Sequence, residues 1–203
     1  MINRFSFPII VLAAGQSRRM RGRDKLLEDV NGVPLVRAQV QKARLATTGL
    51  VIAALPPRPH PRYDVLTDLD ATCLPVPDAA SGMNASLRRS FAALPSEAPC
   101  AMVLLGDLPD LTVADLCQVA AAVDLSGDRQ IWRGATAQGA AGHPIIFRNT
   151  MFDDFAALKG DSGGREVVAA AKGEIELIML TGNRARADLD SPEDWDAWRK
   201  ARS

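Results

Sequence analysis

The chain has 203 residues, 47% of them hydrophobic, and its 24 basic and 24 acidic side chains give a formal net charge of zero. This balance excludes a globally basic nucleic-acid-binding surface, so cationic groups have to act locally. The three cysteines form no C-x-x-C pair, and residues 1–8 show no signal-peptide cleavage pattern. No apolar run is long enough for a membrane span, so we expect a cytoplasmic protein.

Strand and helix patterns alternate along the chain. Strands are predicted at residues 8–14, 50–55, 72–76, 100–105, 130–136, 144–147 and 175–180. Helices are predicted at residues 34–46, 63–69, 83–94, 112–123, 150–158 and 164–171, and a last helix begins after Ser191. Such alternation is typical of α/β proteins, so we expect a three-layer, Rossmann-like, mixed and mostly parallel sheet with helices on both faces.

The first predicted strand ends at a glycine that is followed by a cluster of cations. A strand that ends in a glycine loop exposes backbone N–H groups at the carboxyl edge of a sheet, where open α/β folds bind ligands. Mobile cations beside such groups suit a triphosphate. Neither a Walker loop nor a dinucleotide fingerprint fits, because the next glycine comes seven residues later. The residues concerned are Gly15, Arg18, Arg19, Arg21, Gly22, Arg23 and Lys25.

Two later parts of the chain carry aspartates that could bind a ligand or a metal ion. Asp107 comes directly after the most hydrophobic predicted strand, which we expect to be central, and therefore faces the same edge as Gly15. It also suits an ordinary turn before a helix. Asp188 and Asp190 alternate, so they share one face if the chain is a strand there. The residues from Ser191 onward are a typical helix start without further function, and the cations at 199, 200 and 202 are expected to be a solvated tail.

The segment Leu-Ala-Ala-Gly-x-Ser-x-Arg-Met…Lys resembles the signature of nucleotidyltransferases with a nucleotide-diphospho-sugar-transferase-like fold. Within them it is most similar to the molybdenum cofactor cytidylyltransferases, and ordered segments from residue 9 to about 195 share the resemblance. The resemblance implies catalytic roles for Arg19, Lys25 and Asp107. It implies Mg²⁺ ligands at Asp107 and Asp190, with Asp188 as a further candidate. It implies nucleotide binding by Leu12, Ala13, Ala14, Gly15, Arg18, Gly82 and Ser86.

The resemblance also bears on the two substrates. Ala13-Ala14-Gly15 accompanies CTP in this family, whereas Ala-Gly-Gly accompanies GTP, since a Cβ at the second position narrows the space for a purine. Acceptor contacts are implied for His143, Asp161, Gly163 and Arg165, although Ala141 replaces the basic residue that the family often has. Without the resemblance, the same residues also fit roles without a ligand. Residues 82–86 could be an ordinary helix N-terminus, His143 a structural histidine, and residues 160–165 a flexible turn.

The implied reaction transfers CMP from CTP to molybdopterin or its molybdenum-loaded form, which releases pyrophosphate and gives a cytosine dinucleotide cofactor. In this interpretation one domain spans residues 1–203: about 1–126 bind the nucleotide, and about 127–203 bind the acceptor and supply the second metal ligand. We expect a monomer that meets a target molybdoenzyme or its chaperone transiently. The alternatives are a guanylyltransferase, a transferase for another phosphate acceptor, and a non-catalytic cofactor-binding chaperone.

Overall fold

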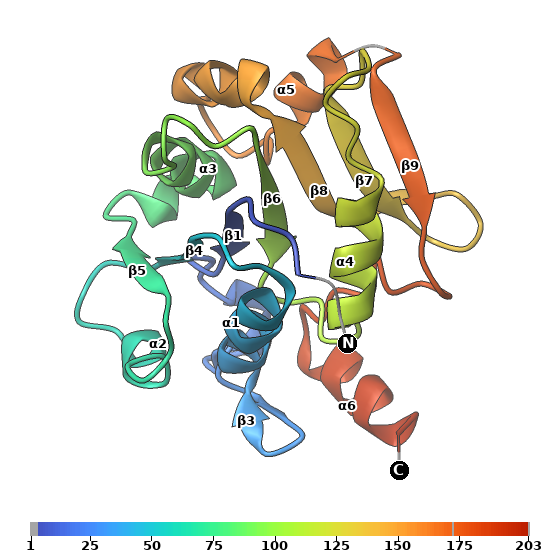
Figure 1. Ribbon diagram of the computed structural model, residues 1–203. Coiled ribbons are helices and arrows are strands. Elements are labelled where there is room, and N and C mark those ends of the chain that lie inside the picture. Colours follow the sequence, from blue (N-terminus) through green and yellow to red (C-terminus); the bar gives the residue numbers. More distant parts are fainter. Residues whose placement is uncertain (1–3, 172, 203) are drawn as a thin grey trace.

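A seven-stranded sheet runs through the protein (Figure 1). The computed structural model describes residues 4–171 and 173–202, so the first three residues of the opening segment lie outside the described part. The strand order is β5-β4-β1-β6-β8-β7-β9. The strands are β1 (Ile9–Leu12), β4 (Val51–Leu55), β5 (Thr72–Pro75), β6 (Cys100–Leu105), β7 (Ile131–Ala135), β8 (Ala141–Arg148) and β9 (Ile175–Met179).

The sheet is mixed and mostly parallel, as the sequence predicts. Strands β5, β4, β1 and β6 run parallel, and β9 runs parallel to β7. Strand β8 is antiparallel to both of its neighbours, β6 and β7. The predicted central strand, β6, is the fourth of the seven. The chain moves outward from β1 to β4 and β5 and then returns to β6, so the order reverses beside β1, where open sheets form a ligand crevice.

Helices cover both faces of the sheet. They are α1 (Leu35–Ala46), α2 (Pro61–Asp64), α3 (Met83–Ala92), α4 (Val113–Ala121), α5 (Arg165–Ala170) and α6 (Pro192–Lys200), with 3₁₀ helices η1 (Arg18–Met20), η2 (Ala79–Ser81) and η3 (Asn149–Ala157). One core joins α1, α4 and α6 to the sheet, and another joins α3, η3 and α5 to its other face. In β1, Ile9 and Val11 enter the first core and Ile10 and Leu12 the second, which explains its unbroken apolar run.

The structure corrects several predicted details. The helix expected at 63–69 begins at Pro61 and ends at Asp64, after which i→i−3 hydrogen bonds continue as turns. The helix expected at 150–158 is instead the 3₁₀ helix η3, whose Asn, Thr and Asp residues have low intrinsic α-helix propensity. Residues 188–190 are not part of a strand. The hairpin of β2 (Asp29–Val30) and β3 (Val33–Pro34) was not predicted, because two-residue strands have no periodicity.

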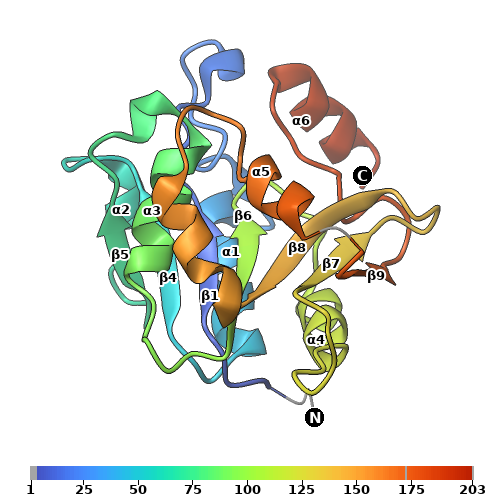
Figure 2. The ribbon, with the colours of Figure 1, turned by 90° about the horizontal axis from the view of Figure 1, so that it is seen from above.

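The last helix is docked rather than solvated. Figure 2 shows α6 and the chain that follows β1 at the same end of the molecule. Arg199 contacts Glu28 at 2.6 Å, and Arg202 pairs with Asp110, so the expectation of a solvated tail is wrong for these two cations. Trp195 is fully buried, with the Arg199 guanidinium 5.1 Å from its ring centre, and Arg202 lies over Trp198. Within the described residues, no helix combines the length and the apolar character that a membrane span requires.

Candidate active site

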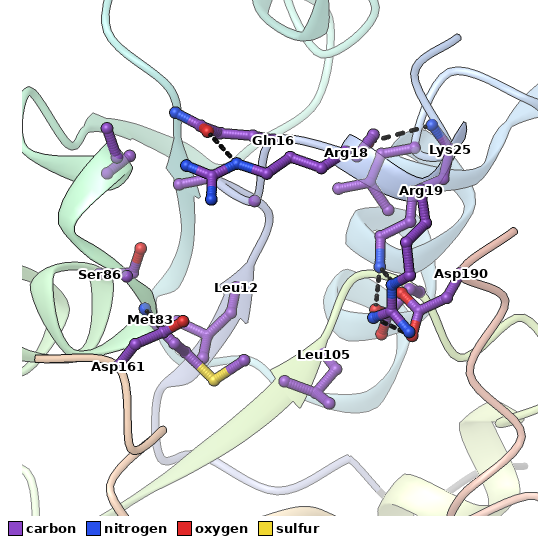
Figure 3. Close-up of a pocket in the computed structure, with 18 residues that line it drawn as sticks. Leu12, Gln16, Arg18, Arg19, Lys25, Met83, Ser86, Leu105, Asp161 and Asp190 are labelled. Carbon is purple, nitrogen blue, oxygen red and sulfur yellow. Dashed lines mark hydrogen bonds and ion pairs between the residues drawn. The ribbon is translucent and has the colours of Figure 1, made fainter. Parts of the chain in front are cut away.

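A cavity of about 330 Å³ lies at the carboxyl ends of β1 and β6 (Figure 3). It collects side chains from the glycine loop, from the start of α3, from the ends of β1 and β6 and from the segments near 161 and 190. The predicted site residues that line it are Leu12, Ala14, Gly15, Arg18, Arg19, Lys25, Gly82, Ser86, Asp107, Asp161 and Asp190. Gln16 and Met83 line it as well and were not singled out from the sequence.

The glycine loop presents open backbone and cations to the cavity. A Cβ built on Gly15 would meet no atom within 4 Å, so this position leaves room for a ligand. Ser17 adopts a left-handed φ of 51° before η1 begins. The Arg18 Nε donates to the Gln16 side chain at 2.9 Å, and Figure 3 shows both side chains along one wall. Ala13 differs from its neighbours: it is buried, and its carbonyl accepts a hydrogen bond from Arg62.

The charged cluster centres on Lys25. Its Nζ lies 2.5 Å from Asp107 Oδ2 and 2.7 Å from Asp190 Oδ1, and the three side chains are only 12–17% exposed. Arg19, which is 71% exposed, reaches the other oxygen of Asp190 at 2.6 Å. The lysine therefore occupies the space between two carboxylates that come from distant parts of the chain.

The surroundings shift the ionisation of this cluster. Burial opposes the charge of Lys25, but the carboxylates of Asp107 and Asp190 outweigh it and raise the pKa of Lys25 above its ordinary value. Burial likewise opposes the charge of Asp190, but Lys25 and Arg19 hold its pKa below the ordinary range. The pKa of Asp188 is raised by burial and by the neighbouring Asp190 and Asp107. The surroundings thus favour the charged forms of Lys25 and Asp190 and disfavour the charged form of Asp188.

Backbone packing fixes the two carboxylates. A Cβ on Gly106 would lie 2.9 Å from the Leu12 carbonyl, so only glycine lets the end of β6 approach β1 here. The next residue is Asp107, whose carbonyl accepts from the Leu189 N–H at 3.1 Å and so draws the segment 188–190 alongside.

A helix cap fixes Asp190 from the other side. Ser191 caps α6 in a reciprocal capping box with Asp194. The same Asp194 carboxylate accepts from the Asp190 N–H at 3.1 Å. The predicted helix start is therefore confirmed, and it also positions the residue immediately before it. Asp188 interacts with Asp190, although the segment is not the strand on which the expectation of a shared face rested, and Asp188 does not line the cavity.

The far wall joins the start of α3 to the segment 159–164. Gly82 has a φ of 113°, and a Cβ there would lie 2.5 Å from the Asp161 side chain. Asp161 Oδ1 accepts from the Met83 N–H at 2.5 Å. Asn84 is buried and holds the same segment, donating to the Lys159 carbonyl at 2.7 Å and to Ser162 Oγ at 2.8 Å. Asp161, assigned to the acceptor from the sequence, thus lies beside the predicted nucleotide residues.

The other residues assigned to the acceptor lie outside this cavity. Gly163 and Arg165 stand before and at the start of α5 and do not line it. His143 is on β8, and its Nδ1 is buried without a hydrogen-bond partner among the described residues. Burial, together with the charge of Arg133, lowers the pKa of His143 to about 4. His143 is therefore neutral at physiological pH.

The site contains carboxylate oxygens and cationic side chains, but its described residues do not form a complete metal site by themselves. Within residues 4–171 and 173–202, no group of three His, Cys, Asp or Glu side chains is arranged to hold a metal ion. Asp107 Oδ1 is nevertheless buried without a hydrogen-bond partner in the same part of the chain. Sequence reasoning also missed Arg62, Asp24 and Asn84, which support the walls. A single arginine after a proline carries no signal that could have found it.

Open backbone, exposed arginines and paired carboxylates lie together at the reversal point of a mixed sheet, where open α/β folds bind ligands. Residues 9–175 match the family model of the MobA-like NTP transferase domain. The chain belongs to this family, which confirms the nucleotidyltransferase prediction at the level of the family.

Two curated relatives share parts of the chain. The bifunctional protein GlmU of Leifsonia xyli subsp. xyli is 28% identical over 145 residues, which are 70% of this chain and 30% of GlmU. The purine catabolism protein PucB of Bacillus subtilis is 30% identical over 103 residues, which are 50% of this chain and 48% of PucB. The matched regions thus span less than half the length of either relative.

Solved structures share the whole fold. Rv0371c of Mycobacterium tuberculosis H37Rv superposes with a TM-score of 0.81 at 25% identity, covering 96% of this chain and 98% of that one. Its manganese complex has a TM-score of 0.79 at 23% identity and covers 97% and 99%. The nucleotidyl transferase Mth528 of Methanothermobacter gives 0.75 at 21% identity, with 96% and 97% covered. These likenesses confirm the predicted fold class.

Proposed function

We propose that this protein transfers CMP from CTP to molybdopterin, or to its molybdenum-loaded form, with release of pyrophosphate. The observation that carries the proposal is the convergence of the glycine loop, Lys25, Asp107 and Asp190 on one cavity. The sequence resemblance to molybdenum cofactor cytidylyltransferases supports the acceptor. Residues up to about 126 would bind the nucleotide, and the rest of the chain would bind the acceptor and supply Asp190.

The cytosine assignment rests on the loop beside Gly15. Ala14 lines the cavity, so its Cβ takes up space that a glycine would leave to a larger base. Gly82 and Ser86 stand on the opposite wall, where small side chains let a flat base or a ribose approach the backbone. This arrangement supports a pyrimidine, in agreement with the Ala-Ala-Gly pattern.

The triphosphate would lie along the cationic side. Arg18, Arg19 and Lys25 all line the cavity, and the first two are exposed and able to move. When the triphosphate binds, Arg19 and Lys25 turn from Asp190 toward its oxygens and neutralise the charge that develops on the departing pyrophosphate. That exchange leaves Asp107 and Asp190 without their cations.

The carboxylates so released fit Mg²⁺. Mg²⁺ prefers oxygen ligands and is usually bound by one or two carboxylates together with substrate phosphates and water. Asp107 offers a buried, unpartnered Oδ1, and Asp190 lies beside it across Lys25. Asp188 stands behind them as a further candidate. Bound there, the ion would reduce the repulsion between two anionic substrates.

Little proton transfer is required of the protein. The terminal phosphate of the acceptor is already ionised and attacks the α-phosphorus in line, so positioning and charge neutralisation dominate catalysis. His143 is neutral at the working pH and outside the cavity, which argues for a structural or hydrogen-bonding role rather than an acid–base one. Asp161 links the acceptor half of the chain to the nucleotide cavity and would orient the two substrates relative to each other.

The test is pyrophosphate release in the presence of Mg²⁺, molybdenum cofactor and each of CTP, GTP, ATP and UTP in turn. Release with CTP alone supports the proposal. Release with GTP keeps the chemistry and overturns the base assignment. Binding of the cofactor by a folded protein without any release would identify a cofactor-carrying chaperone instead, and release only with another phosphate acceptor would replace molybdopterin.

A further inference from the structure

Arg62 is 1% exposed, although it lies on the short helix α2 and does not line the 330 Å³ cavity. A buried guanidinium is costly unless its N–H groups are paired. Its Nε and Nη2 donate to the two oxygens of Asp24 at 2.8 and 2.6 Å. Its Nη1 donates to the Ala13 carbonyl at 2.5 Å, and Nη2 also reaches Ser17 Oγ at 3.3 Å.

These acceptors mark the beginning, the turn and the end of the glycine loop. Ala13 follows β1, Ser17 precedes η1, and Asp24 precedes Lys25. Ser17 Oγ donates to Asp24 at 3.1 Å and accepts from the Lys25 N–H at 3.2 Å. One guanidinium therefore joins both ends of the loop to its turn, and the last link in this chain of bonds is the backbone of Lys25.

The loop needs such a brace. Ser17 and Arg21 have φ values of 51° and 52°, and left-handed backbone costs a residue other than glycine of the order of 1 kcal/mol. No side chain caps η1. The local sequence therefore does not by itself hold the conformation that presents Gly15 to the cavity.

The pair adds no net charge to the site. Burial works against the ionised Asp24, but Arg62 holds the pKa of that carboxyl below its ordinary value, so both partners are charged at neutral pH. Because their charges cancel, the pair does not attract a triphosphate. A lysine could supply the charge of Arg62, but it has neither the planar fork nor the number of donors that tie three acceptors together.

We infer that Arg62 is a positioning residue, which acts through Asp24 and Ser17 to hold the glycine loop and Lys25 in the shape that binds the triphosphate of the nucleotide. The inference rests on the proposed nucleotide site but not on the choice of CTP or of the acceptor. It predicts that loss of the fork weakens the binding of every nucleoside triphosphate and leaves acceptor binding unchanged.

The experiment compares Arg62→Lys with Arg37→Lys in the whole protein. Arg37 is a matched control, because it makes the same two-point contact with Asp68 at 2.6 and 2.7 Å, away from the loop. Calorimetric titration with CTP, GTP, ATP and UTP measures nucleotide affinity without an acceptor, and thermal unfolding reports the fold. For Arg62→Lys we expect affinity for any bound triphosphate to fall by about 10-fold, the effect of losing one charge-assisted hydrogen bond that holds the loop. The control should bind as the wild type does.

Further variants separate positioning from folding. Asp24→Asn removes the negative charge that pairs with Arg62. It should show the same loss of nucleotide affinity and provides the test if Arg62→Lys does not fold. The double variant should bind no worse than either single variant, since both break one linkage. A folded Arg62→Lys protein with wild-type nucleotide affinity overturns the inference, and so does an equal rise of the KM values for nucleotide and acceptor.

The outcome for the wild type keeps the two proposals distinct. If the wild-type protein binds GTP as well as CTP, only the cytosine assignment is overturned. The affinities of Arg62→Lys and wild type can still be compared with either nucleotide, so the role of Arg62 remains testable. Wild-type protein that binds no nucleoside triphosphate overturns the proposed function and this inference together.

Discussion

Lys25 stands between the two carboxylates that we propose as metal ligands, so a metal ion and the lysine compete for the same oxygens. Replacing Lys25 with methionine keeps the length and apolar stem of the side chain and removes the competing charge. We expect Lys25→Met to bind Mn²⁺, a spectroscopic substitute for Mg²⁺, more tightly than the wild type when no nucleotide is present. Activity should fall at the same time, because in the proposed mechanism Lys25 also binds the triphosphate.

The size of the effect follows from the contacts that the metal has to break. Lys25 makes two charge-assisted hydrogen bonds, at 2.5 and 2.7 Å, to side chains that remain 16–17% exposed. At the low end of the usual range each contributes about 1.5 kcal/mol, so the pair opposes metal binding by about 3 kcal/mol. Since 1.4 kcal/mol corresponds to tenfold, the variant should bind Mn²⁺ about 100-fold more tightly.

Titration of Mn²⁺ followed by electron paramagnetic resonance measures this directly. Arg21→Met is the matched control, because it also removes one positive charge from the loop. Arg21 contacts Glu193 rather than Asp107 or Asp190. A saturating nucleoside triphosphate should narrow the difference between Lys25→Met and wild type, because it draws the lysine away. Equal Mn²⁺ affinity of the two proteins without nucleotide would refute the competition, and weaker binding by the variant would refute the assignment of the site.

Three further predictions concern single residues. Asp107→Asn should lower turnover by at least about 10³-fold with an unchanged melting temperature, as steady-state kinetics and calorimetry can check; full activity would remove Asp107 from the metal site. Gly82→Ala should destabilise the protein by about 1–3 kcal/mol in urea unfolding, since its Cβ would lie 2.5 Å from Asp161 at a φ of 113°. Burial lowers the pKa of Lys42 to about 8 from 10.5, so the unfolded chain binds more protons between these values. Stability relative to Lys42→Met should therefore rise from pH 8 to 10.5, by up to about 3 kcal/mol, and a flat difference would contradict the burial.

The fold was predictable where the sequence repeats a physical pattern. Strands β1 and β6 are apolar on both sides because both faces of the sheet are covered, so their unbroken hydrophobic runs identify them. The starts of α4 and α6 were predictable from Thr112 and Ser191, which form capping boxes in the structure. The antiparallel insertion of β8 between β6 and β7 follows from tertiary packing, and no local pattern indicates it.

The site was predictable only where each residue belongs to a motif of its own. The glycine loop and the segments around Asp107 and Asp190 can each be recognised separately, and the order of strands then predicts that they meet. The contact between Arg62 and Asp24 joins residues 38 positions apart, and no local sequence pattern around either residue predicts the contact. The entry of Asp161 into the nucleotide cavity depends on how segment 159–164 packs against α3, which composition cannot specify.

The position of Asp161 also bears on how the proposed reaction would orient its two anionic substrates. The lysine and arginines gather at the glycine loop, whereas the opposite wall carries a carboxylate supplied by the later half of the chain. In the proposed reaction, the exposed arginines of the glycine loop would attract the triphosphate and Asp161 on the opposite wall would repel it, so the nucleotide would enter the cavity in one orientation. Because Asp161 is held by the Met83 N–H at the start of α3, a shift of segment 159–164 toward an acceptor would move this wall as well. If segment 159–164 binds the acceptor as we propose, the contact between Asp161 and the Met83 N–H would transmit its movement to the proposed nucleotide cavity.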